Sequence, residues 1–576
     1  MRLSFHLEIL IGDRKRRETA AGTVGFAEGR ARLSSAAPRV DLSQSGCIVG
    51  PLFKREPLSP RVTELDRYEQ RDIVRSGGAA LLSRYWGGYV ALLEKDDASI
   101  TVLRDPSGMM PCYFRRGSEG VTLASDMTAL AEPGSEEVDY GSLACMFAGI
   151  DMLGRRTGIS NVEELLPGEQ LTVSDAGIRV EQMWTPWNHV EPRKGLDFES
   201  ATHALRDALR QCIGAWSTCF DNILVGVSGG LDSSIVVAAL GSRSPDVRCL
   251  TMVEPGTDGD ERRYACALVE QLGQRLDASN YDLGSVDINR AVLPHLPLPI
   301  AGHYFPAIAS EHKRISSNWP IGAYFAGNGG DNVFCAMRSA APLADRFLAG
   351  GMPPGLFATA RDIADLTGTG LAEVVRHGVA RVRRWREGHR PRRDLRGLGP
   401  SGRAAVLSST DQHPWLSAPA GSLPGKASHV AMLARAYRSI ELYPRDVAPP
   451  QISPLLSQPI VELCLSIPTW YWVRGGRDRA VAREAVRDSL PTLIVERRTK
   501  GGPTGFVRRI FEAQRDDAIA MLSRGKLVAA GLLDPDWLGS AATNSWHSDG
   551  GDLRLLSFAA AESWVRWWED GSDTRR

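Results

Sequence analysis

The chain has 576 residues, which is too long for one hydrophobic core and suits two large domains or three to four small ones. Apolar residues make up 43% and charged residues 24%, as in ordinary globular proteins, and 68 basic residues balance 68 acidic ones. A net charge of zero argues against nucleic acid or an anionic membrane as the principal partner.

Up to about residue 190 the sequence has the pattern of short strands separated by turns. Apolar and polar residues alternate along the first ten positions, which predicts a β-strand. The polar residues also interrupt the continuous apolar core that a signal peptide needs. Residues 87–105 and 168–184 have the pattern of two hairpins. No apolar run approaches the ~20 residues of a membrane span, so we expect no integral membrane segment.

The pattern changes after residue 190, which predicts one domain over 1–190 and a second over 195–576. Residues 197–216 form an amphipathic helical pattern, and strands alternate with helices up to about residue 332. The basic stretch 376–396 is more typical of a solvent-exposed helix and loop than of a binding site for nucleic acid or an acidic peptide, because the chain carries no net charge. Mostly helical patterns resume at about residue 428.

A strand-to-loop-to-helix segment at 222–241 reads NILVGVSGGLDSSIVVAALG. The glycines at 229 and 230 let the backbone approach a ligand and expose amide groups, and the following helix directs its positive end at the loop. Ser228, Ser233 and Ser234 add hydroxyl donors, so the segment suits phosphates. Asp232 would repel phosphate unless a divalent cation lies between them, as Mg²⁺ does.

Two other interpretations of this loop stay open. Residues 226–230 also match G-x-S-x-G, the nucleophile elbow of α/β-hydrolases. A hydrolase would need an upstream oxyanion loop, which is absent, and Asp232 would be unexplained. A turn without a ligand is the other alternative. No Walker-type phosphate loop occurs, which argues against phosphoryl transfer by a P-loop enzyme.

The segment GAYFAGNGGDNVF, at 322–334, predicts a second strand, glycine turn and helix start. Parallel strands share one crevice at their carboxyl ends, so Asp331 is expected to face Asp232 across it and to hold Mg²⁺ from the other side. The alternative role for Asp331 is to cap the helix. Residues 247–253 have the pattern of the next strand, and Lys500 lies in a basic, glycine-rich loop where a lone lysine would otherwise be solvated.

These motifs together resemble the asparagine synthetase family. SGGLDSS resembles the pyrophosphate loop of N-type ATP pyrophosphatases, which cleave ATP between its α and β phosphates. RYWGGYVALL, LRDPSGMMPCYF, LASDMTALA and VEELLPGEQL resemble the family's glutaminase-type domain in order and spacing. AGNGGDNVF resembles its second acidic loop, and SPLLSQPIVELCLSIP and ERRTKGGPTGF resemble later segments. The resemblance covers nearly the whole chain except the basic stretch.

The resemblance implies an α/β fold: an N-terminal Ntn-hydrolase-like α/β sandwich, then a doubly wound ATP-pyrophosphatase domain, of the adenine nucleotide α-hydrolase type, with helical additions. It implies ATP and Mg²⁺ as cofactors, Asp232 and Asp331 as metal ligands, and Asp331 and Lys500 as catalytic residues. Lys500 would neutralise charge that develops as an acyl-adenylate forms or breaks down. The implied ATP-binding residues are Val227, Ser228, Gly229, Gly230, Asp232, Ser233, Ser234, Thr251, Met252, Gly327 and Gly329.

The sequence departs from this family at the glutaminase nucleophile. Asparagine synthetases carry a cysteine at position 2, where this chain has Arg2, and its first cysteine is Cys47. Guanidinium cannot replace a thiolate, so we expect an inert N-terminal domain. Asn328 and Asn332 stand where asparagine synthetases typically have glutamates. The nine cysteines are scattered without a CxxC pair, which predicts reduced thiols in a cytoplasmic protein.

Without glutaminase activity, the amine must come preformed. Relatives of this kind include the β-lactam synthetases and the lasso-peptide cyclases, and the chain looks most like the latter. We therefore expect ATP-dependent adenylation of an Asp or Glu side chain in a leader-cleaved precursor peptide, closed as a macrolactam by its N-terminal amine. A leader peptidase and a leader-recognition protein are the implied partners. An asparagine synthetase, a β-lactam-synthetase-like ligase on a small amino acid, a substrate-binding pseudoenzyme and the hydrolase stay open.

Overall fold

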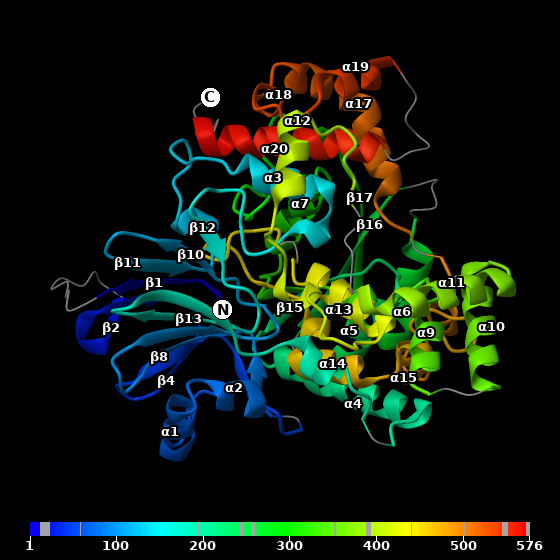
Figure 1. The fold of residues 1–576 in the computed structure, drawn as a ribbon, viewed down its shortest axis with the longest axis horizontal. Coiled ribbons are helices and arrows are strands. Elements are labelled where there is room, and N and C mark those ends of the chain that lie inside the picture. The colour runs from blue at the N-terminus through cyan, green and yellow to red at the C-terminus, as the bar shows by residue number, and fades with distance from the viewer. Residues whose placement is uncertain are drawn as a thin grey trace.

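The structure is a computed structural model that describes residues 1–11, 23–57, 59–193, 195–241, 246–254, 260–350, 353–387, 393–438, 441–499, 501–543 and 551–571. Its N-terminal part is built on antiparallel sheets and its C-terminal part on a parallel sheet surrounded by helices (Figure 1). This confirms the fold class predicted from the sequence. The domain boundaries at 190 and 195 stay a prediction.

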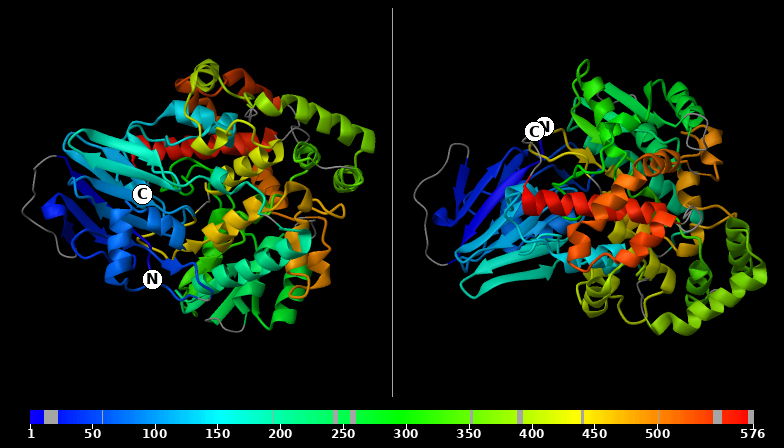
Figure 2. Two further views of the ribbon diagram at one scale, coloured as in Figure 1. Left: turned by 60° about the horizontal axis from the view of Figure 1, so that its bottom comes forward. Right: turned by 90° about the horizontal axis from the view of Figure 1, so that it is seen from above.

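Two six-stranded antiparallel sheets form the N-terminal part and lie one over the other (Figures 1 and 2). Alternate residues of the first strand, Phe5, Leu7 and Ile9, are buried, as the alternating pattern predicts. One sheet has the order β12 (Val162–Glu164), β10 (Tyr113–Arg116), β11 (Gly120–Ala124), β1 (Phe5–Leu10), β3 (Ala31–Ser35) and β2 (Thr23–Phe26). The other has the order β14 (Gly177–Gln182), β13 (Glu169–Ser174), β9 (Ile100–Arg104), β8 (Val90–Glu94), β5 (Gly46–Val49) and β4 (Arg39–Asp41).

Both predicted hairpins are present in the second sheet. Strands β8 and β9 pair antiparallel, as do β13 and β14. Smaller elements complete this part of the chain: the pair β6 (Leu52–Lys54) and β7 (Tyr85–Gly87), and the helices α1 (Arg67–Arg75), α2 (Ala79–Arg84) and α3 (Tyr140–Ala148).

The C-terminal part contains a five-stranded sheet in which every pair of neighbours is parallel. Ile223 on one face of the sheet packs in the same core as Ile235 of a following helix, whereas Leu224 on the other face packs with Ile315. Helices therefore cover both faces, which is the doubly wound arrangement. The order is β17 (Arg275–Asn280), β16 (Asp246–Val253), β15 (Asn222–Gly226), β18 (Ala323–Phe325) and β19 (Gln451–Ile452).

Helices make up most of the remaining chain. The predicted amphipathic helix is α4 (Phe198–Ser217), capped by the Asp197 side chain. The predicted basic stretch begins within α11 (Leu371–Arg384), whose arginines are exposed; residues 388–392 lie outside the described residues. The other α-helices are α5 (Leu231–Leu240), α6 (Arg262–Leu272), α7 (Phe305–Ser316), α8 (Gly330–Val333), α9 (Ala341–Leu348), α10 (Gly355–Thr367), α12 (Pro400–Ser408), α13 (Pro424–Ala436), α14 (Gln458–Ser466), α15 (Ala480–Ala485), α16 (Thr492–Val495), α17 (Thr504–Ser523), α18 (Lys526–Ala529), α19 (Pro535–Thr543) and α20 (Gly551–Asp570).

The two parts of the chain share a buried interface. Trp216 of α4 packs edge-on against Phe53, with ring centroids 5.3 Å apart. Arg55 donates to Glu462 of α14 at 2.7 and 3.0 Å, and Trp184 donates to the same carboxylate at 3.0 Å. Both apolar burial and paired charges therefore hold the N-terminal sheets against the C-terminal helices. Within the described residues, no helix combines the length and apolar character that crossing a bilayer requires.

Candidate active site

The order of the parallel sheet reverses between β15 and β18. The chain runs outward through β15, β16 and β17, and then returns to place β18 on the opposite side of β15. The loops that follow β15 and β18 therefore leave neighbouring strands at the same edge, where open α/β sheets bind ligands. These are the two glycine-containing loops that carry Asp232 and Asp331.

Glycine lets these two loops touch. A Cβ at Gly327 would lie 2.4 Å from the Ser233 backbone nitrogen, and one at Gly330 would lie 2.5 Å from the Asp232 carboxyl carbon. Any larger side chain at either position would separate the loops. The glycines of the second loop thus set the distance between the two predicted ligand-binding segments.

The first loop turns sharply from β15 into α5. Gly229 has a φ of +61°, and its backbone is so close to Tyr264 that a Cβ would lie 2.5 Å from the tyrosine Cβ. The Ser228 amide donates to Ser233 Oγ at 3.3 Å, whereas Ser234 Oγ donates to the Gly230 carbonyl at 2.8 Å. Ser233 Oγ also reaches the Gly230 carbonyl at 3.4 Å, but Ser228 and Ser233 both line the adjoining cavity, whereas Ser234 does not.

Asp232 and Asp331 converge on a single nitrogen atom. Arg479 Nη1 lies 3.0 and 2.9 Å from the two carboxylate oxygens of Asp232 and also donates to Asp331 Oδ1. Its Nε donates to Asp478 at 2.7 Å. The Asp232 side chain is 10% exposed and that of Arg479 is 9% exposed, so most of this network is shielded from solvent.

Electrostatics in this network favour the charged forms. Burial alone would lower the pKa of Arg479, but Asp232, Asp331 and Asp478 outweigh it and raise that pKa above its usual range. Burial likewise disfavours the Asp478 carboxylate, but Arg479 and Arg483 lower its pKa. The guanidinium and the carboxylates therefore stabilise one another, and each would be costly to leave without its partners.

A second arginine fixes the outer wall of the first loop. Arg497 donates to the Gly229 carbonyl at 2.9 Å, pairs with Glu261, and lies over the Tyr264 ring with its carbon 3.7 Å from the ring centroid. Glu261 also accepts from the Gly501 amide at 2.8 Å. The glycine-rich segment next to residue 500 is thereby tied to the first loop.

A cavity of about 360 Å³, here called the switch-point cavity, opens between the two loops. The first loop and Gly327 form one end, and three arginines add positive charge. Apolar and aromatic groups at Met252, Tyr281 and Phe305 form another part of its wall. Exposed amides and guanidinium groups beside an apolar surface suit a ligand that joins phosphates to a flat heterocycle. The arginines are Arg479, Arg483 and Arg497.

The structure places most of the predicted ligand-binding residues at this cavity. Those that line it are Val227, Ser228, Gly230, Asp232, Ser233, Met252 and Gly327; those that do not are Gly229, Ser234, Thr251, Gly329 and Asp331. Gly329 is the cap of α8, with a φ of +81°, so the alternative that Asp331 caps this helix is wrong. Lys500 lies outside the described residues, and its catalytic role stays a prediction.

The pair of carboxylates fits a divalent cation. Asp232 and Asp331 direct oxygen atoms at one point that a positive group already occupies. Across the described residues, no group of three or more His, Cys, Asp or Glu side chains could hold a metal ion. Proteins often hold Mg²⁺ with one or two carboxylates while phosphates and water complete its shell, so Asp232 and Asp331 are the residues that would hold it here.

Sequence reasoning missed Arg479, Arg483, Arg497 and Gln451, all of which line the switch-point cavity. The segment RGGRDRAVAREAV carried a signal, since it is an arginine cluster followed by an apolar helix in a part of the chain that already resembled the family. Nothing in that pattern alone distinguishes an arginine at an active site from a solvated one.

Comparisons with known proteins give the family. The model described as asparagine synthase matches residues 204–441 and 450–566, which is more than half of the chain. A model described as a glutamine amidotransferase domain matches residues 72–184. No curated protein matches the sequence.

Several solved structures show a weak likeness. The allosteric regulatory enzyme of purine biosynthesis is 12% identical with a TM-score of 0.19, over 48% of this chain and 74% of that one. Glutamine phosphoribosylpyrophosphate amidotransferase from B. subtilis, complexed with ADP and GMP, is 11% identical with a TM-score of 0.18, over 50% and 77%. Glutamine-dependent NAD+ synthetase from Acinetobacter baumannii, in complex with ADP, is 15% identical with a TM-score of 0.17, over 35% and 43%.

These TM-scores are too low to support an argument about the site, so the family models carry the assignment. The larger of them includes both acidic loops and the arginines that face them. The chain therefore belongs to the asparagine synthase family, a family of ATP-dependent amide ligases.

Proposed function

We propose that this chain activates a carboxylate by adenylation and joins it to an amine, with release of pyrophosphate and AMP. The observation that carries the proposal is the convergence of Asp232 and Asp331 on one cationic nitrogen at the switch point of the sheet. Two carboxylates from separate loops around a positive centre are what a polyphosphate with its metal requires.

Each part of the switch-point cavity has a role in this reaction. Exposed amides of the first loop, with Ser228 and Ser233, would hold the β and γ phosphates, and Asp232 and Asp331 would hold Mg²⁺, which supplies positive charge to the phosphates when bound. Arg479, which lies between the two carboxylates in this structure, would give up that point to the metal and neutralise charge as pyrophosphate leaves. Lys500 would neutralise charge that develops as the acyl-adenylate forms or breaks down, the role that the resemblance implies. The apolar wall at Met252 suits the adenine ring.

The N-terminal part offers no activated thiol. Its cysteines are Cys47, Cys112 and Cys145, and all three are buried. Burial raises the pKa of Cys47 and of Cys112 to about 12, and it also raises the pKa of Cys145. A buried thiol that stays protonated at neutral pH is a poor nucleophile. These observations support a proposal that this part does not hydrolyse glutamine.

We expect no conversion of glutamine to glutamate by the purified protein above the rate without enzyme, because no described thiol in the glutaminase-like part is both accessible and ionised. The measurement is glutamate release from glutamine with and without ATP. Cys47→Ala is the matched variant and is expected to leave ligation unchanged. Glutamate formation that Cys47→Ala abolishes would contradict this assignment.

A preformed amine is then required, and we propose that it belongs to the same peptide as the carboxylate. On this proposal the substrate is a leader-cleaved core peptide whose Asp or Glu side chain is adenylated and whose N-terminal amine closes a macrolactam. Support comes from the buried, protonated cysteines and from Asn328 and Asn332, which stand where asparagine synthetases typically carry glutamates. Asn332 donates to the Met432 carbonyl at 2.6 Å, so it acts as a structural link. A cytoplasmic location and a leader peptidase with a leader-recognition protein belong to the same proposal.

The test uses leader-free peptides with a free N-terminal amine and a single Asp or Glu placed at successive positions. With ATP and Mg²⁺, a peptide of suitable spacing is expected to become one water lighter, with AMP and pyrophosphate formed in equal amounts. Adenylation makes the carboxylate a good acyl donor, and the protein positions the amine for attack. The N-acetylated peptide is the control and cannot cyclise. Formation of asparagine from aspartate and ammonia, with every peptide ignored, would contradict the cyclase assignment.

A further inference from the structure

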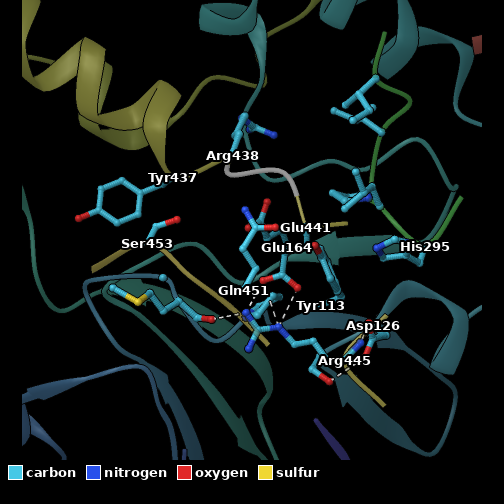
Figure 3. Close-up of a pocket in the computed structure, with 18 of the residues that line it drawn as sticks. Tyr113, Asp126, Glu164, His295, Tyr437, Arg438, Glu441, Arg445, Gln451 and Ser453 are labelled. Carbon is cyan, nitrogen blue, oxygen red and sulfur yellow. Dashed lines mark hydrogen bonds and ion pairs between the residues drawn. The ribbon is translucent and has the colours of Figure 1, made fainter. Parts of the chain in front are cut away.

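A second cavity of about 310 Å³ lies where the N-terminal sheets meet the C-terminal helices (Figure 3). This junction cavity has a mostly apolar wall, which includes Met146, Leu153 and Leu298. Gln451 of β19 lines both the junction cavity and the switch-point cavity. A molecule in the junction cavity would therefore lie beside the proposed site of adenylation.

Two ion pairs in the wall of the junction cavity are already matched. Arg104 donates to Glu164 at 2.8 Å and to the carbonyls of neighbouring residues. Arg445, 1% exposed in its side chain, pairs with Glu441 and also donates to the Met109 carbonyl. Arg445 thereby links the C-terminal part to the N-terminal part, and the two ion pairs leave no charge among their own four side chains to attract a ligand.

Asp126 and His295 differ from these pairs. Asp126 has no ion-pair partner, and one ring nitrogen of His295 has no hydrogen-bond partner, among the described residues. Asp126 is 8% exposed and accepts only the Arg445 amide at 3.2 Å and the Ser125 hydroxyl at 3.1 Å, and it forms no ion pair with a described residue. His295 is 6% exposed, and its Nε2 has no hydrogen-bond partner within the described part of the chain. A buried polar atom without a partner calls for an explanation.

The ring nitrogen that lacks a partner is an acceptor. Burial lowers the pKa of His295, so the ring is neutral, and a hydrogen bond to the backbone of Glu441 opposes that shift, as expected where the other ring nitrogen donates to a carbonyl. Burial also raises the pKa of Asp126. His295 and Asp126 lie on the same side of the cavity, and Tyr437 and Ser453 lie on the other (Figure 3). One side of the cavity thus offers a carboxylate and a ring nitrogen that has no hydrogen-bond partner among the described residues.

We infer that the junction cavity binds the amine-bearing end of the substrate, with a primary ammonium group between Asp126 and His295. An ammonium group has three donors and one positive charge, which match these two acceptors. The apolar wall would contact the side chain of one amino-acid residue, and Arg438, Gln451 and Ser453 offer donors to its carbonyl oxygen. The inference rests on the proposed function, because it gives that reaction's amine a binding site.

The test measures binding of L-alaninamide without ATP, by saturation-transfer NMR and competition. L-lactamide is the matched ligand, since it has the same size but carries a hydroxyl group in place of the ammonium. The wild-type protein is expected to bind L-alaninamide at least about tenfold more tightly than L-lactamide, because only the ammonium pairs with the buried carboxylate. Equal affinity for the two ligands would overturn the inference.

Two variants test whether the preference for L-alaninamide over L-lactamide arises in the junction cavity. Asp126→Asn keeps the volume and an acceptor for the Arg445 amide, and it is expected to reduce the preference for L-alaninamide to about twofold or less. His295→Phe keeps an aromatic ring but removes Nε2, and it is expected to weaken the binding of L-alaninamide several-fold. Asp96→Asn, in an exposed turn, is the control and should match the wild type. A full preference in both Asp126→Asn and His295→Phe would overturn the inference.

The binding test and the proposed function fail separately. L-alaninamide binding needs no nucleotide, so its outcome does not depend on adenylation. Absence of carboxylate-dependent pyrophosphate exchange in the wild type would refute the proposed function alone. Normal exchange without any preference for the ammonium ligand would refute the amine site alone.

Discussion

Asp232→Asn and Asp331→Asn are each expected to lower carboxylate-dependent ATP–pyrophosphate exchange by roughly 10²–10³-fold or more. Each carboxylate contributes one negative charge to the point where Arg479 now lies and where Mg²⁺ would bind. Asparagine keeps the shape of the side chain but removes that charge. The measurement is exchange of labelled pyrophosphate into ATP in the presence of a cyclisable peptide.

Folding must be checked beside activity, because Asp232 is buried and paired with Arg479. Asp331 is 41% exposed in its side chain, so Asp331→Asn is expected to lower the free energy of unfolding less than Asp232→Asn does. Asp517→Asn, on the exposed side of α17, is the matched control. Exchange close to the wild-type rate in folded Asp232→Asn and Asp331→Asn would show that these carboxylates are not metal ligands.

Arg479→Met is expected to lower the free energy of unfolding by about 3 kcal/mol, because it leaves Asp232 buried without its cation. The same variant is expected to lower turnover by roughly 10²–10³-fold, as for other preorganised charges at an active site. Chemical denaturation measures the first quantity, and AMP release measures the second. Saturating ATP with Mg²⁺ should restore part of the stability, since the bound cation would compensate the same carboxylates.

Arg508→Met provides the comparison for Arg479→Met. Arg508 is 61% exposed in its side chain and pairs with Glu512 on the surface of α17, so its loss should change stability by less than about 1 kcal/mol. If Arg479→Met were as stable and as active as Arg508→Met, the arginine between the two loops would have neither role. Loss of stability with full turnover would leave Arg479 a structural residue only.

Local pattern was enough to predict the elements that position the site. The runs at 222–226 and 323–325 are short, mostly apolar and followed within three residues by a glycine, and each is a strand in the structure. Their adjacency also follows from general rules for open parallel sheets. The position of the crevice depends on the reversal of strand order between these two strands. The alternation of strands and helices along the sequence is compatible with that reversal but does not determine it.

The remaining parts of the site depend on contacts that local pattern does not show. Strand β19 has only two residues, Gln451 and Ile452, which is too short for any periodicity, yet it places Gln451 between two cavities. Arg479 meets Asp232 from 247 positions away in the sequence, and it is the N-cap residue of the short helix α15, with a φ of +52°. His295 and Asp126 come together only because the two parts of the chain pack against each other.

The most direct measurement of the central claim follows the oxygen atoms of the substrate. A cyclisable peptide whose single Asp or Glu side chain carries ¹⁸O in both carboxyl oxygens is incubated with ATP and Mg²⁺, and the nucleotide product is analysed by mass spectrometry. Attack of the carboxylate on the α-phosphate predicts AMP that carries one ¹⁸O atom and a cyclic peptide that retains the other. Unlabelled AMP, or label found in inorganic phosphate with ADP as the nucleotide product, would contradict adenylation.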